Sequence, residues 1–102
     1  MGIIEKMRLD GKGAFVTGGA RGIGKSVATA FAEAGANVAI ADIDINEARK
    51  TADAIAKATG VKSIAIQTDV TKADQVTAMV DEVVKAFGRL DIALTTRQKQ
   101  AL

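Results

Sequence analysis

The sequence predicts an α/β protein in which helices cover a parallel β-sheet, and three observations support this prediction. Short apolar runs alternate with longer amphipathic stretches, and this unit recurs three times within the 102 residues. A glycine follows each amphipathic stretch, at Gly35, Gly60 and Gly88, where it is suited to end a helix. A further cluster of glycines separates the first apolar run from the first amphipathic stretch. Successive strand–helix units give parallel strands joined by right-handed crossovers, so helices are expected on the faces of the sheet.

The first unit begins at residues 14–17, a short apolar run that predicts a buried strand. Gly13 precedes this run, and a glycine in a strand costs about 0.5–1 kcal/mol relative to alanine. A helix is expected over Gly22–Ala34, because apolar residues recur there at spacings of three and four. This apolar stripe consists of Ile23, Val27, Ala30, Phe31 and Ala34.

The second unit begins with a strand expected over Val38–Asp42. Asp44 and Glu47 then stand three residues apart, which is the spacing of a capping box at the start of a helix. The expected core-facing stripe of this helix is Ala48, Ala52, Ile55 and Thr59.

The third unit combines a strand over Ser63–Thr68 with a helix that has Thr71 as its expected N-cap and Asp74 in its first turn. The expected core face of this helix is Val76, Met79, Val80, Val83 and Phe87. A fourth strand is expected over Leu90–Leu94. Residues 95–102 lack the apolar pattern, so we expect one domain over residues 1–94 followed by a polar tail.

The composition excludes several kinds of chemistry. The chain has no Cys and no His, which removes disulfides, thiolate nucleophiles and the usual zinc ligands, so no metal site is expected. It has no Tyr or Trp and a formal net charge of only +2, so nucleic-acid binding is not expected. Residues 1–10 contain no long apolar run, and we expect a cytoplasmic protein without a membrane partner.

The glycine cluster lies within Thr17–Ser26, whose sequence is TGGARGIGKS, between the first strand and the first helix. The N-terminus of a helix offers unpaired N–H groups and a positive dipole end to an anion. In this setting Gly18 allows a tight turn, Gly22 allows the backbone to approach a pyrophosphate, and Gly24 allows the helix to lie close to the sheet.

The same segment also satisfies a second pattern, that of a phosphate loop. Gly19, Gly24, Lys25 and Ser26 match G-x-x-x-x-G-K-S/T, in which Lys reaches the β/γ-phosphates and Ser holds magnesium. Asp42 argues against this hypothesis, because it ends the second strand near the position at which dinucleotide folds place a ribose-binding acid. Asp42 or Asp69 would hold magnesium in an NTPase, but no water-positioning residue accompanies them. A third alternative is a glycine-rich turn that binds no ligand.

From about Leu9 to Leu94 the chain resembles the short-chain dehydrogenase/reductase family. Thr17–Gly24 matches the T-G-x-x-x-G-x-G cofactor loop of that family, and Asp42 matches the acid that closes its second strand. Asp69 and Val70 match the Asp-Val pair that follows its third strand, and Phe87–Asp91 resembles its F-G-x-I/L-D approach to the fourth strand. Each match is short, but their order and spacing together are specific to the family.

The resemblance implies a Rossmann-like three-layer α/β/α fold, here incomplete, with strand order 3-2-1-4. Residues 1–94 would form the N-terminal half of an NAD(P)-binding domain, with a dinucleotide as the partner. In the family's pattern the pyrophosphate lies on Gly18, Arg21, Gly22, Ile23 and Gly24, the ribose at Asp42, and the adenine at Asp69 and Val70. The Asp42 carboxylate would repel the 2′-phosphate of NADP, so NAD is the expected cofactor, although Arg21 is placed to reach that phosphate.

The implied activity is the interconversion of secondary alcohols, such as sugar alcohols, and ketones. The family continues after its fourth strand with Asn-Asn-Ala-Gly and later with a Ser and a Tyr-x-x-x-Lys pair, whereas this chain has Thr95-Thr96-Arg97-Gln98 and no Tyr. No catalytic residue is therefore predicted, and we expect this chain to be inactive by itself. The alternative is a non-catalytic nucleotide-binding or structural fragment.

The segment after Leu94 carries two further hypotheses. Codons for Asn-Asn-Ala-Gly, shifted by one base, encode Thr-Thr-Arg, so one lost base would account for Thr95, Thr96 and Arg97. In the family's strand order, the strand at Leu90–Leu94 would be left at an edge of the sheet with unpaired backbone groups. We therefore expect self-association, or exchange of this strand between copies, through Leu90–Leu94.

Overall fold

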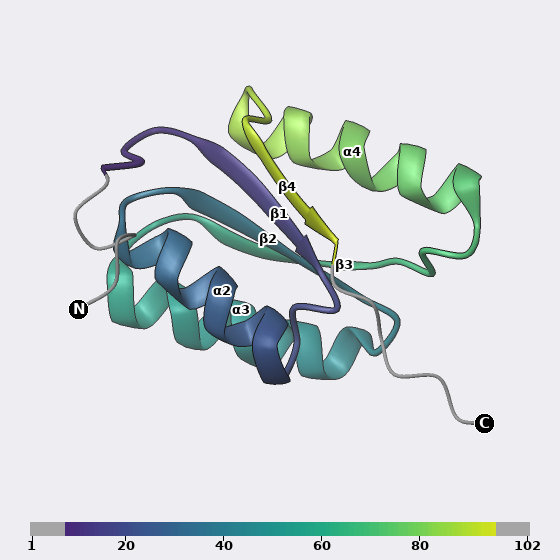
Figure 1. The fold of residues 1–102 in the computed structure, drawn as a ribbon, viewed down its shortest axis with the longest axis horizontal. Coiled ribbons are helices and arrows are strands. Elements are labelled where there is room, and N and C mark those ends of the chain that lie inside the picture. The colour runs from purple at the N-terminus through teal and green to yellow at the C-terminus, as the bar shows by residue number, and fades with distance from the viewer. Residues whose placement is uncertain (1–7, 96–102) are drawn as a thin grey trace.

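A computed structural model describes residues 8–95 and contains one four-stranded parallel sheet with three helices (Figure 1). The elements, in chain order, are β1 (Gly13–Thr17), α2 (Gly22–Glu33), β2 (Asn37–Asp42), α3 (Ile45–Thr59), β3 (Ser63–Gln67), α4 (Ala73–Phe87) and β4 (Ile92–Thr95). The strand order is β3-β2-β1-β4, with every pair parallel. The predicted Rossmann-like fold and strand order are confirmed. The expected tail falls almost wholly outside the described residues, although its first residue, Thr95, ends β4.

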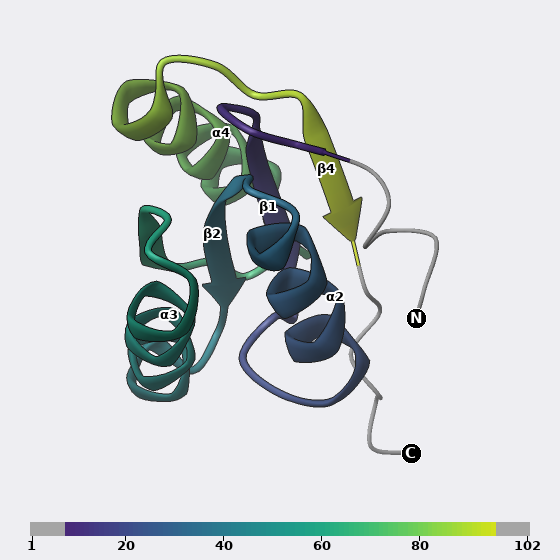
Figure 2. The ribbon, with the colours of Figure 1, turned by 90° about the vertical axis from the view of Figure 1, so that its left-hand side faces the viewer.

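The sheet lies between α2 and α3 on one face and α4 on the other (Figure 2). Successive residues of a strand point to opposite faces, so β1 and β2 supply both cores. Val16, Val38 and Ile40 pack against α2 and α3, whereas Phe15, Ala39 and Ala41 pack against Met79 and Val83 of α4. Within residues 8–95, no helix has the length and apolar character needed to cross a bilayer.

The buried side of α2 differs from the predicted stripe. The residues of α2 that are buried are Gly24, Ala28 and Ala32, whereas Ile23, which the stripe placed in the core, is 79% exposed. All three buried residues are small, so this side lets the helix approach the sheet closely. Phe31 is only partly buried and packs at the border of the core. The predicted stripe is therefore wrong by one residue over Ile23–Phe31, whereas Ala34, the C-cap, is buried as predicted.

The two later helices begin in different ways. Asp44 caps α3 as predicted and accepts a hydrogen bond from the Glu47 N–H at 3.2 Å. The predicted cap of α4 is wrong, because Lys72 occupies the N-cap and has no side-chain capping bond. Thr71 lies one residue before the N-cap, and its hydroxyl donates to Asp69 Oδ1 at 2.6 Å in the turn that precedes the helix.

The glycine at position 13 has a structural reason that the sequence did not show. A Cβ at Gly13 would collide with the carbonyl oxygen of Arg89, which crosses the start of β1. The Gly13 N–H donates to Asp91 Oδ2 at 2.9 Å, and the Asp91 N–H donates to the Gly13 carbonyl at 2.8 Å. This close crossing attaches the segment before β4 to the start of β1.

Candidate functional site

All eight residues that the sequence assigned to cofactor binding lie at one edge of the sheet, where its parallel strands end. Four segments meet there: the loop from β1 to α2, the first turn of α2, the end of β2, and the residues after β3. Ligands of open α/β sheets bind in the crevice beyond this carboxyl edge. The residues concerned are Gly18, Arg21, Gly22, Ile23, Gly24, Asp42, Asp69 and Val70.

The loop after β1 is held across the end of β2. Gly18 has a φ of +67°, which a residue with a side chain rarely adopts, and its N–H donates to the Ala41 carbonyl at 2.7 Å. A Cβ at Gly24 would collide with the Gly18 carbonyl and would lie 3.0 Å from the Gly19 Cα. Gly24 therefore allows the helix to pack against the loop itself, whereas the sequence suggested contact with the sheet.

The positive dipole end at the N-terminus of α2 is not offset by any residue of its own first turn. Its N-cap, Arg21, makes no side-chain capping bond, and its first turn contains no acidic residue. The first backbone bond into the helix runs from the Lys25 N–H to the Arg21 carbonyl at 3.4 Å. Among the described residues, no acceptor is bonded to the N–H groups of Gly22, Ile23 or Gly24. Three free amides at a positive helix end fit an anionic group such as a diphosphate.

Asp42 is 3% exposed and joins two loops at the edge. Its Oδ2 accepts from the Ala20 N–H at 3.2 Å, and its Oδ1 accepts from the Asp44 N–H at 3.0 Å. The carboxylate thus binds the glycine loop to the turn that enters α3. Each oxygen of an ionised carboxylate can accept more than one hydrogen bond.

The polar groups of Asp69 form hydrogen bonds with residues of the turn after β3 and the start of α4. The Asp69 N–H donates to Gln75 Oε1 at 2.9 Å, and Asp69 Oδ1 accepts from both the hydroxyl and the N–H of Thr71. These two hydrogen bonds, that from the hydroxyl first, lower the pKa of Asp69 below its ordinary value. The side chain therefore serves the turn as well as any ligand that it contacts.

An apolar rim accompanies these polar groups. Of the four large apolar side chains that are exposed within residues 8–95, three lie at this edge. They are Ile23, Ile43 and Val70, which are 79%, 57% and 42% exposed. An apolar surface beside a few placed polar groups is typical of small-molecule sites and suits the faces of a heterocyclic base. Sequence analysis gave Ile43 no role in the site, and its only signal was an apolar residue directly after Asp42.

Thr68 is a second residue that sequence analysis missed. Its backbone N–H donates to the Asp42 carbonyl at 3.0 Å, which places it between two predicted site residues. The side chain is buried, and its hydroxyl has no hydrogen-bond partner among the described residues. A buried hydroxyl is normally satisfied by protein, water or ligand, so Thr68 adds a polar atom beside the site.

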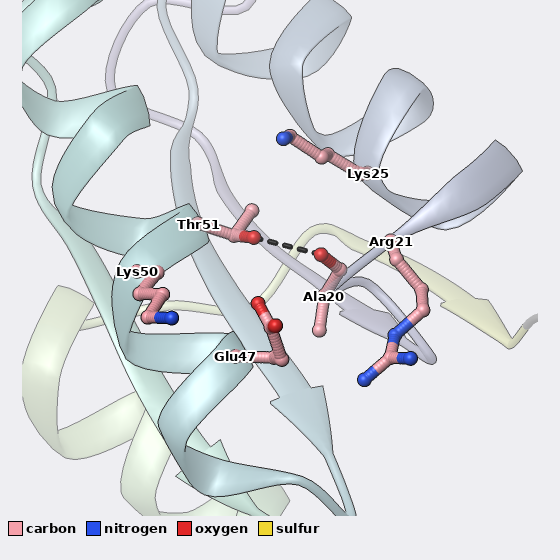
Figure 3. A pocket seen from close by; sticks show the side chains of 6 residues that line it. All are labelled: Ala20, Arg21, Lys25, Glu47, Lys50 and Thr51. Atoms are coloured by element: carbon pink, nitrogen blue, oxygen red, sulfur yellow. Dashed lines mark hydrogen bonds between the residues drawn. The ribbon is translucent and has the colours of Figure 1, made fainter.

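The residues of the phosphate-loop pattern are arranged differently from what an NTPase requires. The Ser26 hydroxyl donates back to the Gly22 carbonyl at 3.4 Å, within its own helix. Lys25 extends over the groove between α2 and α3, where it lines a hollow with residues of α3 (Figure 3). The Ser26 hydroxyl, which would hold magnesium, is thus bonded within its own helix, and Lys25 borders the hollow between α2 and α3.

Comparison with known proteins identifies the class. Residues 12–96 match the family model described as short chain dehydrogenase, and the chain belongs to this family of oxidoreductases, which use NAD(P). Three relatives illustrate its range. The chain is 43% identical to the short chain dehydrogenase/reductase astE of Aspergillus oryzae, 48% identical to the 3-oxoacyl-(acyl-carrier-protein) reductase FabG of Staphylococcus aureus, and 46% identical to the sorbitol dehydrogenase of Cereibacter sphaeroides.

These alignments cover 88%, 79% and 84% of this chain, but only 34%, 33% and 32% of the relatives. The chain therefore spans about a third of the length of the curated relatives that it matches. The hydroxysteroid dehydrogenase of Escherichia coli superposes with a TM-score of 0.83 at 36% identity over 89% of this chain and 38% of that one. The NADPH-dependent 3-quinuclidinone reductase of Rhodotorula rubra gives 0.82 at 35% identity, over 90% and 35%.

Proposed function

We propose that this chain binds NAD at the carboxyl edge of its sheet as the cofactor-binding portion of a short-chain oxidoreductase. The observation that carries the proposal is the open N-terminus of α2, whose three unbonded amides lie in the turn that follows the loop held by Asp42. An exposed helix end without a capping side chain or an acidic residue leaves its amides available to water or to an anion, which the helix dipole favours.

In this proposal the residues divide among three parts of the cofactor. The N–H groups of Gly22, Ile23 and Gly24 hold the diphosphate, with the glycine at 18 shaping the loop and Arg21 supplying positive charge. The Asp42 carboxylate accepts the hydroxyls of the adenosine ribose, and its negative charge favours NAD over NADP. Bound NAD supplies a nicotinamide ring that accepts or donates a hydride.

The adenine lies, in this proposal, at the end of β3. Asp69 and Val70 border one side of the base, and Ile43 offers an apolar surface on the other. Both apolar side chains are more than two-fifths exposed, so a base that covers them removes apolar surface from water. This contact adds affinity without selecting between NAD and NADP.

The whole enzyme to which residues 1–94 contribute is proposed to interconvert secondary alcohols and ketones in the cytoplasm. The sorbitol dehydrogenase among the relatives supports a sugar alcohol as the substrate. The chain contains no Tyr, His or Cys, so it offers none of these groups for proton transfer to a carbinol. We therefore propose that this chain binds cofactor without turning over substrate.

Separate calorimetric titrations with NAD and with ATP plus magnesium test this function. We expect saturable binding of NAD at one site per chain and no magnesium-dependent binding of ATP. Binding of ATP alone would support the phosphate-loop hypothesis. Binding of neither nucleotide would leave the alternative of a purely structural fragment.

Substituting Gly24→Ala links the binding to the glycine loop. The added Cβ collides with the backbone of the loop, and overpacking of this kind costs about 1–3 kcal/mol in stability. We expect NAD affinity to fall at least about tenfold, because the helix must move away from the loop that positions the diphosphate. Gly60→Ala is the matched control: Gly60 lies at the far end of α3 with open space around its Cβ, so its cost in stability should leave NAD affinity unchanged.

A further inference from the structure

A preformed hollow lies between α2 and α3, behind the glycine loop (Figure 3). It has a volume of about 330 Å³. The residues that line it are Ala20, Arg21, Lys25, Glu47, Lys50 and Thr51. Ala20 and Thr51 are both 3% exposed and are joined by a bond of 2.7 Å, from the Thr51 hydroxyl to the Ala20 carbonyl. This buried hydrogen bond fixes one wall of the hollow, and the other four lining side chains lie at the surface or are half-buried.

The hollow is strongly cationic for its size. Three basic side chains line it against a single carboxylate, that of Glu47. Arg21 is paired with Asp44 at 3.1 Å. Lys25 and Lys50 form no ion pair with any described residue, although they approach the hollow from opposite helices (Figure 3). Both lysines are exposed at the rim of the same hollow, so an anion bound there would be attracted by two positive charges.

The helices add to the positive potential. Arg21 is the N-cap of α2, and Lys25 lies one turn further along. Glu47 and Lys50 belong to the first two turns of α3. Both helices therefore direct their positive ends toward the edge at which the hollow opens. The acid in the first turn of α3 offsets part of this potential but leaves the lysines in excess.

We propose that this hollow, the α2–α3 groove, binds a phosphomonoester, with Lys25 and Lys50 as the residues that hold its dianionic phosphate. The diphosphate of a dinucleotide would occupy a different place, on the amides of Gly22, Ile23 and Gly24. Ala20 separates the two places: its N–H is bonded to Asp42 and its carbonyl to Thr51. A phosphate in the groove would have one of two sources. It would belong to a dinucleotide that carries a 2′-phosphate on the ribose at Asp42, or to an independent phosphorylated metabolite.

Titration with inorganic phosphate, followed by amide chemical shifts and matched with chloride at equal ionic strength, tests the groove. We expect saturable shifts confined to residues 20–25 and 47–51. The double variant Lys25→Gln/Lys50→Gln should bind phosphate about tenfold more weakly, as expected for the loss of two charge-assisted contacts. Lys57→Gln/Lys85→Gln removes the same charge from the last turns of α3 and α4 and should bind as the wild type does. Shifts that do not saturate, or an equal loss in both double variants, would overturn the proposal.

Parallel titrations with NAD and NADP identify the source of the phosphate. If the groove variant weakens NADP but not NAD, the 2′-phosphate occupies the groove, and this outcome rests on the proposed function. If the variant weakens inorganic phosphate alone, the ligand is an independent phosphomonoester. A wild-type chain that binds phosphate in the groove but no NAD would contradict the proposed cofactor site and leave the groove intact.

Discussion

Asp42 holds together the loop and the turn that flank the proposed site, and it does so through one buried and one partly buried hydrogen bond from the backbone. The Ala20 and Asp44 N–H groups both depend on its carboxylate, at 3.2 and 3.0 Å. A single side chain thus shapes the glycine loop and the entry to α3 before any ligand arrives. Preorganisation of this kind reduces the entropic cost of binding a cofactor.

Replacing Asp42→Asn removes one of the two acceptor oxygens and places an NH₂ group against a backbone N–H. We expect the free energy of unfolding to fall by about 1–3 kcal/mol, the usual cost of an unsatisfied buried group, as measured by urea denaturation. We also expect the preference for NAD over NADP to shrink, since the repelling charge is gone. Asp53→Asn is the control, because Asp53 is exposed on α3 and should change stability by less than about 0.5 kcal/mol. Equal effects of the two substitutions would contradict this role of Asp42.

Sequence analysis could select candidate site residues only where a local pattern marks them. Gly18, Gly22 and Gly24 stand close together between a strand and a helix, and Asp42 ends the second strand, as the structure also has it. It missed Thr51, whose bond to Ala20 depends on how α3 packs against a loop far away in the sequence. Contacts of this kind depend on tertiary structure, so no local sequence pattern predicts them.

The positions of the helices and strands were largely predictable from the sequence. The side of each helix that is buried was not always predictable. The helix α2 carries apolar residues around much of its circumference, so spacing alone did not choose between the side of Ile23 and the side of Gly24. In the structure the buried side of α2 is the one that carries Gly24, Ala28 and Ala32, because small residues let the helix lie close to both the loop and the sheet. The faces of α3 and α4 were predicted well, since polar residues bound their apolar stripes clearly: Ala48, Ala52, Ile55, Met79 and Val83 are buried as expected.

The attachment of β4 to β1 should respond to pH. Asp91 accepts hydrogen bonds from the Arg89 guanidinium at 2.7 Å and from the Gly13 N–H at 2.9 Å, which lower its pKa to about 2. An unfolded Asp has a pKa of about 3.9, so the stabilisation is present above about pH 4 and is lost as the pH falls toward 2. Asp91→Asn should therefore lower the urea midpoint at neutral pH, and the gap to the wild type should close on acidification. Asp81→Asn, on the exposed side of α4, should show no such convergence. A gap that stays constant between pH 7 and pH 2 would refute this role of Asp91.

At the scale of the molecule, the alternation of strands and helices was enough to predict the architecture. Three short apolar runs, each followed by an amphipathic stretch, permit few arrangements other than a parallel sheet covered on both faces. The order β3-β2-β1-β4 came from family resemblance, and the structure confirms it. This order places β4 at an edge of the sheet, with no strand beyond it among residues 8–95.

An edge of this kind is expected to pair with a second copy of the chain. Within residues 8–95 no strand pairs with the outer side of β4, and Ile92 and Leu94 are only partly buried. The net charge of +2 opposes association weakly. We expect the apparent mass in light scattering to rise with concentration. Ala93→Lys places a charge at the exposed centre of β4 and should keep the chain monomeric, because the same charge then stands in both copies. Ala78→Lys introduces the same charge on the exposed side of α4 and should leave association unchanged. A wild-type chain that stays monomeric at every concentration, or association that both substitutions weaken equally, would show that β4 is not the contact.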